Sequence, residues 1–263
     1  MMEDVQITKN IRKSILDMMY TSRSSHIGSC FSIVEILYTL YFRILKIRGT
    51  QFDLVVDDKF ILSKAHGSVA LYATLGERGF FDKKKLEEYY VDGGSLPGHL
   101  DMKSASGIEC SGGSLGHGLS IGIGMAIANQ KSNVYVLLGD GECNEGSVWE
   151  AVMLASHLQL ANLTAIIDYN KLQGFGETNE VINQKNLHER WSAFGWNAIE
   201  VNGHNVDELE KELKRPSDKP KAIIAHTIKG KGVSFMENKL EWHYKSPNKD
   251  EYLLARSELE GAL

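Results

Sequence analysis

The sequence predicts an α/β fold, a three-layer structure in which a parallel sheet carries helices on both faces. Apolar runs of strand length alternate along the chain with segments of helical length and periodicity. Most of these runs are apolar at consecutive positions, which is typical of strands covered on both sides. With 263 residues, 43% of them hydrophobic, the chain can bury one sizeable core or at most two small ones. We therefore expect a single domain over residues 1–263.

The N-terminal half is predicted to be mainly helical. Apolar side chains recur at helical spacing over 7–20, and the segment 32–43 is apolar nearly all round, as in a buried helix. A short strand at 59–62 and a helix at 69–78 follow. Residues 93–113 are rich in Gly and Ser and predict a long loop, and such loops in compact domains are usually functional or disordered.

The C-terminal half begins with small residues throughout 115–129. Glycines cost helix stability, so their expected gain is a close backbone approach to a neighbouring helix or to a ligand. Four apolar runs then predict strands at 134–138, 163–167, 198–201 and 222–225. Helices are expected at 144–158, 186–194 and 206–214. This alternation favours a parallel sheet.

Composition excludes several classes of function. The net charge of −5 leaves no basic surplus for a nucleic acid or an anionic membrane. We find no apolar stretch that approaches the ~20 residues of a membrane span, and the polar N-terminus lacks a signal-peptide core. The three cysteines are odd in number and far apart, so we expect reduced thiols. These features predict a cytoplasmic protein.

Two acidic turns follow predicted strands. Gly139-Asp140-Gly141 comes after the run 134–138, and Asp168-Tyr169-Asn170 ends the run 163–167. In open α/β sheets, ligands bind beyond the carboxyl ends of the strands. Taken alone, Asp140 could belong to an ordinary Asp-Gly turn. A hairpin turn should lead into a pairing strand, however, and the helical segment 144–158 follows instead.

These turns together suit a divalent cation that bridges a diphosphate. Mg²⁺ prefers near-octahedral oxygen ligands and usually retains substrate phosphates and water. The Asp140 carboxylate, the Asn170 amide oxygen and the Leu172 carbonyl would supply three ligands. Two diphosphate oxygens and a water would complete six, and Gly141 would let the backbone approach a phosphate.

Six segments resemble, in order, the motifs of thiamine-diphosphate enzymes and among them of transketolases. They are Ser25–Gly28, Leu62–Gly67, Pro97–His99, Gly113–Gly118, Gly139–Gln173 and His226–His243. Six motifs in order make the resemblance specific, and they span nearly the whole chain. Two positions depart from the family pattern: His117 replaces a glutamine and Ile27 replaces a proline, both on the donor side of the pocket.

The resemblance implies roles for four histidines, whose unperturbed pKa near ~6.5 suits repeated proton movement on sugar hydroxyls. His66 would contact the diphosphate side of the cofactor and the donor sugar. His26 and His99 would hold sugar hydroxyls, and His243 would assist proton transfer. Cofactor contacts are implied for His66, Gly113, Ser114, Leu115, Gly141, Glu142, Asn170 and His243. We expect His157, His188, His204 and His226 to be solvated or hydrogen-bonded bystanders.

The resemblance covers only a diphosphate-binding domain. In transketolases the carboxylate that acts on the cofactor's aminopyrimidine lies on a second, pyrimidine-binding domain. We therefore expect the N-terminal subunit of a split transketolase, whose partner is a C-terminal subunit in an α2β2 assembly. It would transfer a two-carbon ketol unit from a ketose or its phosphate to an aldose or its phosphate. The implied cofactors are thiamine diphosphate and Mg²⁺, for which Ca²⁺ or Mn²⁺ could substitute.

Three alternatives remain open at this point. A subunit like deoxyxylulose-phosphate synthase is suggested by Lys229-Gly230-Lys231-Gly232 and Trp242-His243. The second alternative is a non-catalytic regulatory subunit that binds the cofactor. The four retained histidines argue against it, because a pure binding module has no need of them. A dinucleotide-binding domain is disfavoured because no Gly-x-Gly-x-x-Gly turn follows the first strand, with an acidic residue about twenty residues further on.

Overall fold

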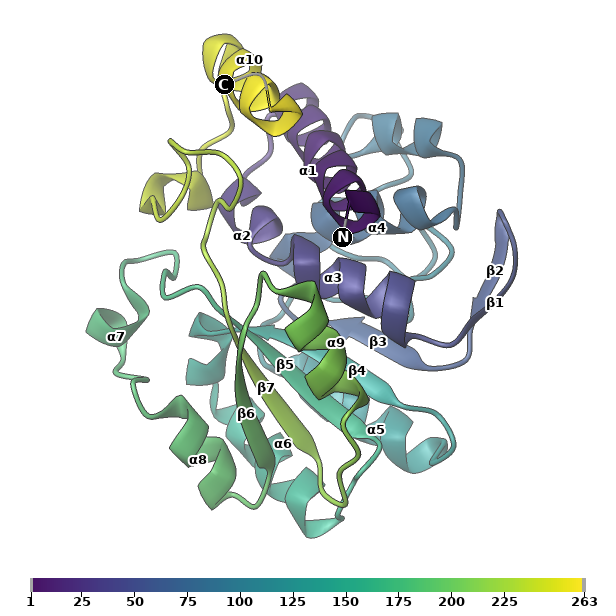
Figure 1. Cartoon of the computed structure of the whole chain (residues 1–263), viewed down its shortest axis with the longest axis vertical. Coiled ribbons are helices and arrows are strands. Elements are labelled where there is room, and N and C mark those ends of the chain that lie inside the picture. Colours follow the sequence, from purple (N-terminus) through teal and green to yellow (C-terminus); the bar gives the residue numbers. More distant parts are fainter. Residues whose placement is uncertain (1, 262–263) are drawn as a thin grey trace.

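Five parallel strands form the central sheet of the structure, a computed structural model that describes residues 2–261 (Figure 1). The strand order is β3-β4-β5-β7-β6, and every neighbouring pair is parallel. The bounds are Lys59–Leu62 (β3), Val134–Gly139 (β4), Leu163–Tyr169 (β5), Asn197–Asn202 (β6) and Lys221–His226 (β7). All five predicted strands are confirmed; β3 has the predicted bounds and the other four are longer.

Successive side chains of each strand enter different hydrophobic clusters, so the sheet is covered on both faces. On β4, Tyr135 and Leu137 pack into one cluster, whereas Val134, Val136 and Leu138 pack into the other. The first cluster takes side chains from α1 (Met2–Ser22), α2 (Ile27–Phe31), α3 (Val34–Thr39), α4 (Ser68–Arg78) and α9 (Val206–Lys214). The second takes them from α5 (His117–Ala128), α6 (Gly146–His157) and α8 (Leu187–Ala193). The predicted three-layer α/β architecture is confirmed (Figure 1).

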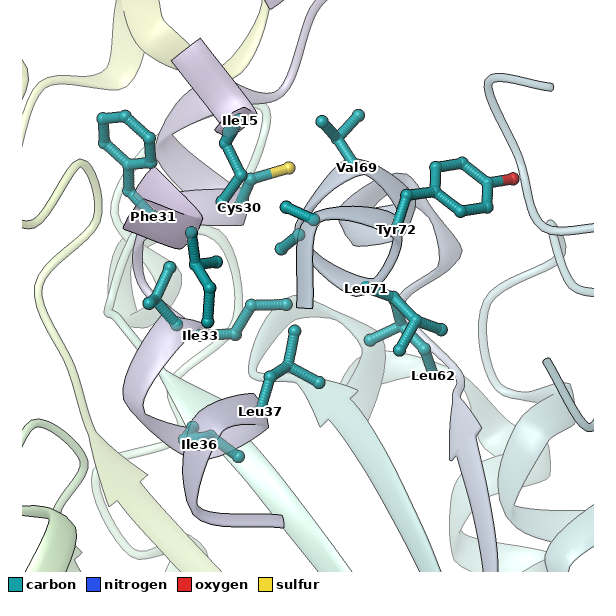
Figure 2. Close-up of a cluster of buried hydrophobic side chains, with 14 of the residues drawn as sticks. Ile15, Cys30, Phe31, Ile33, Ile36, Leu37, Leu62, Val69, Leu71 and Tyr72 are labelled. Carbon is teal, nitrogen blue, oxygen red and sulfur yellow. The ribbon is translucent and has the colours of Figure 1, made fainter. Parts of the chain in front are cut away.

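The apolar segment predicted as one helix over 32–43 is helical from Val34 to Ile44. It consists of α3 followed directly by a π-helical turn at Leu40–Ile44, and it packs against α4. The short helix α2, which ends at Phe31, precedes it and was not predicted. Figure 2 shows side chains such as Ile33 and Leu37 converging with Leu71 of α4. The window Ile27–Ile44 has the length and composition of a membrane span, which corrects the expectation that no stretch comes close, but 83% of it is buried inside the fold.

The helices expected at 69–78, 144–158, 186–194 and 206–214 are confirmed as α4, α6, α8 and α9, and the Gly-rich segment forms α5. The first helix runs from Met2 to Ser22 and exceeds its predicted bounds at both ends. Residues 93–113 contain no helix and only one isolated β-bridge, between Tyr89 and Leu96. The three cysteines are free thiols.

Several elements were not predicted. The hairpin of β1 (Ile47–Thr50) and β2 (Asp53–Val56) is largely exposed, and its only apolar run is Leu54–Val56. α7 (Thr178–Val181) is a single turn. α10 (Lys249–Glu260) does have a sequence signal, because Asn248 and Glu251 form a capping box at its start. This helix returns to α1, where Tyr252 stacks on Tyr20 with ring centroids 4.3 Å apart.

Candidate functional site

A cavity of about 450 Å³ lies beyond the carboxyl ends of β3, β4 and β5. Its wall contains every residue singled out from the sequence except one. These residues are His26, His66, His99, Gly113, Leu115, Asp140, Gly141, Glu142, Asn170, Leu172 and His243. The exception, Ser114, lines an adjoining hollow that shares Gly113 with the cavity. The fold thus brings together side chains from six separate stretches of sequence.

Asp140 occupies the first turn after β4 and is only 3% exposed. One carboxylate oxygen accepts the Gly141 N–H at 2.7 Å, and the other accepts the Lys171 N–H at 2.7 Å and the Thr178 hydroxyl at 2.8 Å. Burial, followed by the nearby charge of Asp168, raises the pKa of Asp140. Within residues 2–261 this carboxylate makes no ion pair, so its charge is left without a direct counter-ion.

Asp168, at the end of β5, differs because a lysine neutralises it. The Lys64 ammonium lies 2.6 Å from its Oδ2, and both side chains are buried. Burial alone would raise the pKa of Asp168, but the Lys64 charge and the hydrogen bonds to the carboxylate lower it. Asp168 also accepts from Asn170 Nδ2 at 2.9 Å, which turns the Asn170 Oδ1 atom away from Asp168.

The donor set fits a hard divalent cation. A buried carboxylate without a counter-ion, Asp140, and a fixed amide oxygen, on Asn170, line the same cavity, and the Leu172 carbonyl follows on the same turn. Carboxylate, amide and carbonyl oxygens are the ligands that Mg²⁺ and Ca²⁺ take in proteins. A cation here would balance the charge of Asp140, which the surrounding hydrogen bonds do not.

Three histidines face one another at the cavity. The ring centroids of His26 and His243 are 5.0 Å apart, those of His26 and His66 5.3 Å, and those of His66 and His243 5.8 Å. His26 has φ 82, a left-handed conformation that is uncommon outside glycine and clusters at functional sites. Its N–H donates to the His243 carbonyl at 2.9 Å, which joins the two motifs directly.

These three rings are held neutral. Burial is the main cause, and it lowers the pKa of His26 to about 4 and that of His243 to about 3. The pKa of His66 is also lowered well below its usual value, by burial and then by Lys64. Neutral imidazoles can donate hydrogen bonds through one nitrogen and accept through the other.

His99 enters the cavity from the long loop, which α4 anchors. The Tyr72 hydroxyl donates to the Pro97 carbonyl at 3.0 Å, and the Ser68 hydroxyl donates to the Gly98 carbonyl at 2.6 Å. His99 lies against Gly113, where an added Cβ would be 3.7 Å from the His99 ring. This explains how an irregular segment presents a defined side chain.

Lys229 was not predicted as a site residue, yet its side chain is fully buried beside the cavity. Its ammonium donates to the Leu172 carbonyl and to His243 Nδ1, both at 2.8 Å. Because Nδ1 accepts, the network assigns the proton of neutral His243 to Nε2. Burial, and then the charge of Lys64, lower the pKa of Lys229 to about 8.

Glu142 also lines the cavity, but its oxygens are occupied by the protein. Oε1 accepts the Gly116 N–H at 2.8 Å and the Ser63 hydroxyl, and Oε2 accepts the Gly139 N–H at 3.0 Å. These bonds fix the turn before α5, and the cofactor contact expected of Glu142 stays a prediction. Gly116 itself has φ +81, and a Cβ there would lie 2.4 Å from Ser147 Oγ.

Gln173 is a second cavity residue that the sequence did not single out. Its Nε2 atom is buried and has no hydrogen-bond partner among the residues that the structure describes. A buried donor without a partner costs about 1–3 kcal/mol. The side chain lies against Gly141, where an added Cβ would come within 2.9 Å of Gln173 Cγ. The Gln173 Nε2 atom is therefore free to donate to a ligand in the cavity.

Fold and site together define a parallel α/β domain with a polar ligand site at its strand ends. The chain matches the family model described as transketolase, thiamine diphosphate binding domain, over residues 3–260. It therefore belongs to the transketolase family, as the motifs predicted.

Two relatives, each named as one subunit of a transketolase, match over almost their whole length. The chain is 39% identical to such a subunit of the apulose-4-phosphate transketolase of Phocaeicola vulgatus, over 95% of this chain and 90% of that one. It is 40% identical to the 6-deoxy-6-sulfo-D-fructose transketolase subunit SqwG of a Clostridium species, over 98% and 96%.

Longer proteins match over part of their length. Human transketolase is 39% identical over 89% of this chain and 38% of its own. The solved transketolase from Leishmania mexicana superposes with a TM-score of 0.88 at 26% identity, over 98% of this chain and 41% of that one. The chain thus spans about two fifths of such transketolases.

Proposed function

We propose that this chain is the N-terminal subunit of a split transketolase, active with a second polypeptide. Together they transfer a two-carbon ketol unit from a ketose or its phosphate to an aldose or its phosphate. The observation that carries the proposal is the single cavity that joins Asp140 and Asn170 to the clustered histidines. Two relatives that match over 90% or more of their length are named as subunits, which supports the need for a partner.

In this proposal, Asp140, Asn170 and the Leu172 carbonyl hold Mg²⁺, which Ca²⁺ or Mn²⁺ can replace, and the cation holds the diphosphate. Gln173 Nε2, which has no partner among the described residues, donates to the diphosphate, and Gly141 lets the backbone approach it. When bound, thiamine diphosphate supplies the carbon nucleophile that accepts the two-carbon unit. The turn Gly113–Leu115 lines the cofactor rings with its backbone, and Glu142 fixes that turn through Gly116.

The histidines of this chain bind and orient the sugar. His26 and His99 bind its hydroxyls, and His66 contacts both the diphosphate side and the donor sugar. His243 donates a hydrogen bond from its Nε2–H to the substrate oxygen, since Lys229 occupies Nδ1. A neutral donor avoids placing another positive charge beside Lys64 and Lys229.

The partner is proposed to supply the pyrimidine domain, in an α2β2 assembly. α5 and α6 pack together and leave large apolar side chains exposed: Ile121 (39%), Ile127 (48%), Met153 (51%) and Leu154 (47%). Leu115, which also lines the cavity, is 36% exposed, so apolar exposure extends from the cavity onto α5. Exposed apolar patches of this kind mark protein interfaces.

Reconstitution tests the proposal. The chain is purified alone and co-purified with the product of a neighbouring reading frame that encodes a pyrimidine-type domain. Ketol transfer from xylulose 5-phosphate, fructose 6-phosphate and unphosphorylated ketoses is then measured, with pyruvate as a control donor. We expect activity only in the complex, and we expect His99→Ala to reduce that activity. Robust ketol transfer by the chain alone, or use of pyruvate in place of a ketose, would overturn it.

A further inference from the structure

The loop that follows β7 carries Lys229 into the cavity wall and contains two glycines in left-handed conformations. Gly230 has φ +80 and Gly232 has φ +97. Glycines leave a chain free to adopt many conformations. Two backbone hydrogen bonds restrain this loop, from the Asn238 N–H to the Lys229 carbonyl and from the Gly230 N–H to the Gly28 carbonyl, both at 2.9 Å, and buried side chains supply the rest. The position of Lys229 matters because its ammonium determines the hydrogen bonding of both Leu172 and His243.

A buried charge cluster outside the cavity holds this loop. Arg12 of α1 and Glu35 of α3 form a two-pronged ion pair with N···O distances of 2.6 and 2.8 Å. Glu35 Oε2 lies 2.8 Å from His204 Nδ1. All three side chains are largely buried, with side-chain exposures of 7% for Arg12, 11% for Glu35 and 14% for His204.

Both ends of this cluster reach the loop, on either side of Lys229. His204 Nε2 accepts the Ile228 N–H at 2.8 Å. Arg12 Nε donates to the Lys231 carbonyl at 2.8 Å. Gly232 also packs on the Arg12 side chain, since an added Cβ would lie 3.1 Å from Arg12 Cδ.

We propose that Arg12, Glu35 and His204 form a loop clamp whose function is to position Lys229, and through it His243, in the proposed cofactor site. All three are positioning residues, since the clamp contacts the loop and not the cavity. His204, expected from the sequence to be a bystander, is the member that joins β6 to the loop. The effect of the clamp on cofactor binding rests on the proposed function, whereas its effect on the loop does not.

The chemistry of the clamp suits positioning. Taking an arginine and a glutamate out of water costs free energy, and a buried ion pair is often no more stabilising than apolar side chains of similar volume. Its directional bonds, however, fix geometry that apolar packing leaves loose. Here the bonds on Lys231 and Ile228 flank the one residue of the loop that reaches Leu172 and His243.

The test compares His204→Phe, which keeps the ring volume but removes both nitrogen contacts, with His204→Gln, which retains an acceptor for Ile228. The matched control is His188→Phe, because His188 is also half-buried and bonds a backbone carbonyl, that of Ala198, away from the cavity. Amide hydrogen exchange of 226–232 is measured in each full-length chain. The affinity for thiamine diphosphate with Mg²⁺ is measured calorimetrically in the reconstituted complex.

We expect His204→Phe to speed exchange at 226–232 by at least tenfold and to weaken cofactor affinity by about tenfold. His204→Gln should remain within about threefold of wild type in both measurements, and His188→Phe should change neither. Should His204→Phe fail to fold, Glu35→Gln takes its place with the same expectation.

Exchange at 226–232 that is unchanged, or that rises only as much as in the rest of the chain, would overturn the clamp. Faster exchange with unaltered cofactor affinity would overturn its positioning function. If wild-type complex binds no thiamine diphosphate, the proposed function fails, whereas local exchange at 226–232 still tests the clamp.

Discussion

Individual residues at the cavity balance buried charges of both signs. Lys64 neutralises Asp168, whereas Asp140 is surrounded by hydrogen-bond donors without a cation. Lys229 is the second buried ammonium and contacts the Leu172 carbonyl instead of a carboxylate. One further cation beside Asp140 would complete this arrangement, and its ligands are those expected from the sequence.

Asp140→Asn separates metal binding from folding. We expect the variant to stay within about 1 kcal/mol of wild type in free energy of unfolding, because removing a buried charge offsets the weaker hydrogen bonds. Metal-dependent affinity for thiamine diphosphate should fall at least about 100-fold. Urea unfolding and calorimetric titration check the two parts. Asp250→Asn, at an exposed position on α10, is the control, and unaltered cofactor affinity in Asp140→Asn would contradict the account.

The histidine cluster predicts a loss of stability in mild acid. The pKa of His26 is about 4 and that of His243 about 3 in the folded chain, against a usual value of 6.5. The unfolded chain therefore takes up protons first as the pH falls, which favours unfolding. The contribution to stability is complete above pH 6.5 and is lost as the pH falls from there to about 4 for His26 and about 3 for His243.

Urea midpoints measured from pH 7.5 to pH 4.5 check this expectation. His26→Gln should flatten the decline, whereas His157→Gln, at an exposed position on α6, should follow wild type. Identical pH profiles for wild type and His26→Gln would show that His26 is not held neutral.

The sequence predicted residues with recognisable motifs and missed those defined by packing. Asp140 and Asn170 follow apolar runs, so their position at strand ends could be deduced. Gln173 and Lys229 lie inside recognised motifs but carry no local signal of their own, and His204 lies outside the motifs. Their importance comes from burial and from contacts between distant segments. The Arg12 contact with Lys231 spans most of the chain and has no local signal.

Among the elements, α5 explains why glycines occur within a helix. A Cβ at Gly122 would lie 2.6 Å from Val136 Cγ2 on β4, so this glycine lets the helix approach the sheet. A Cβ at Gly124 would meet nothing within 4 Å. The close backbone approach expected for these glycines therefore occurs on the face of α5 that packs on the sheet, and not at Gly124.

This difference gives a matched pair of substitutions. Gly124→Ala should stabilise the isolated chain by up to about 1 kcal/mol, because alanine is the better helix former. Gly122→Ala should destabilise it by about 1–3 kcal/mol, because the added methyl group overpacks the contact with β4. Urea unfolding of both variants checks the expectation, and equal effects of the same sign would refute the close approach at Gly122.

Strand prediction succeeded where burial and local pattern coincide. β4 and β5 are buried at every position, and their apolar runs show it directly. The β1–β2 hairpin was missed because most of its residues are exposed and its one apolar run, Leu54–Val56, is only three residues long. The change to π-helical geometry at Leu40–Ile44 could not be deduced from an apolar pattern that continues across it.

At the scale of the molecule, the cavity and the exposed face of α5 and α6 point to a second chain. The partner would cover apolar side chains and close the cavity in one step. Such an interface concentrates its binding energy in a few buried side chains.

Met153→Glu tests this surface. The side chain is 51% exposed, so the free energy of unfolding of the isolated chain should change little. Affinity for the partner should fall about tenfold or more, because a charge would be buried at the interface. Leu253→Glu, 54% exposed on α10, is the matched control. Surface-binding kinetics measure both, and equal losses of affinity in the two variants would argue against the α5–α6 face.

The most direct test of the whole account is to locate the metal. Crystals grown with thiamine diphosphate and Mn²⁺ would give an anomalous difference peak at the cation. We predict one peak within about 2.3 Å of an Asp140 carboxylate oxygen, of Asn170 Oδ1 and of the Leu172 carbonyl, with diphosphate oxygens completing the shell. A peak elsewhere, or a diphosphate bound away from these oxygens, would contradict the account.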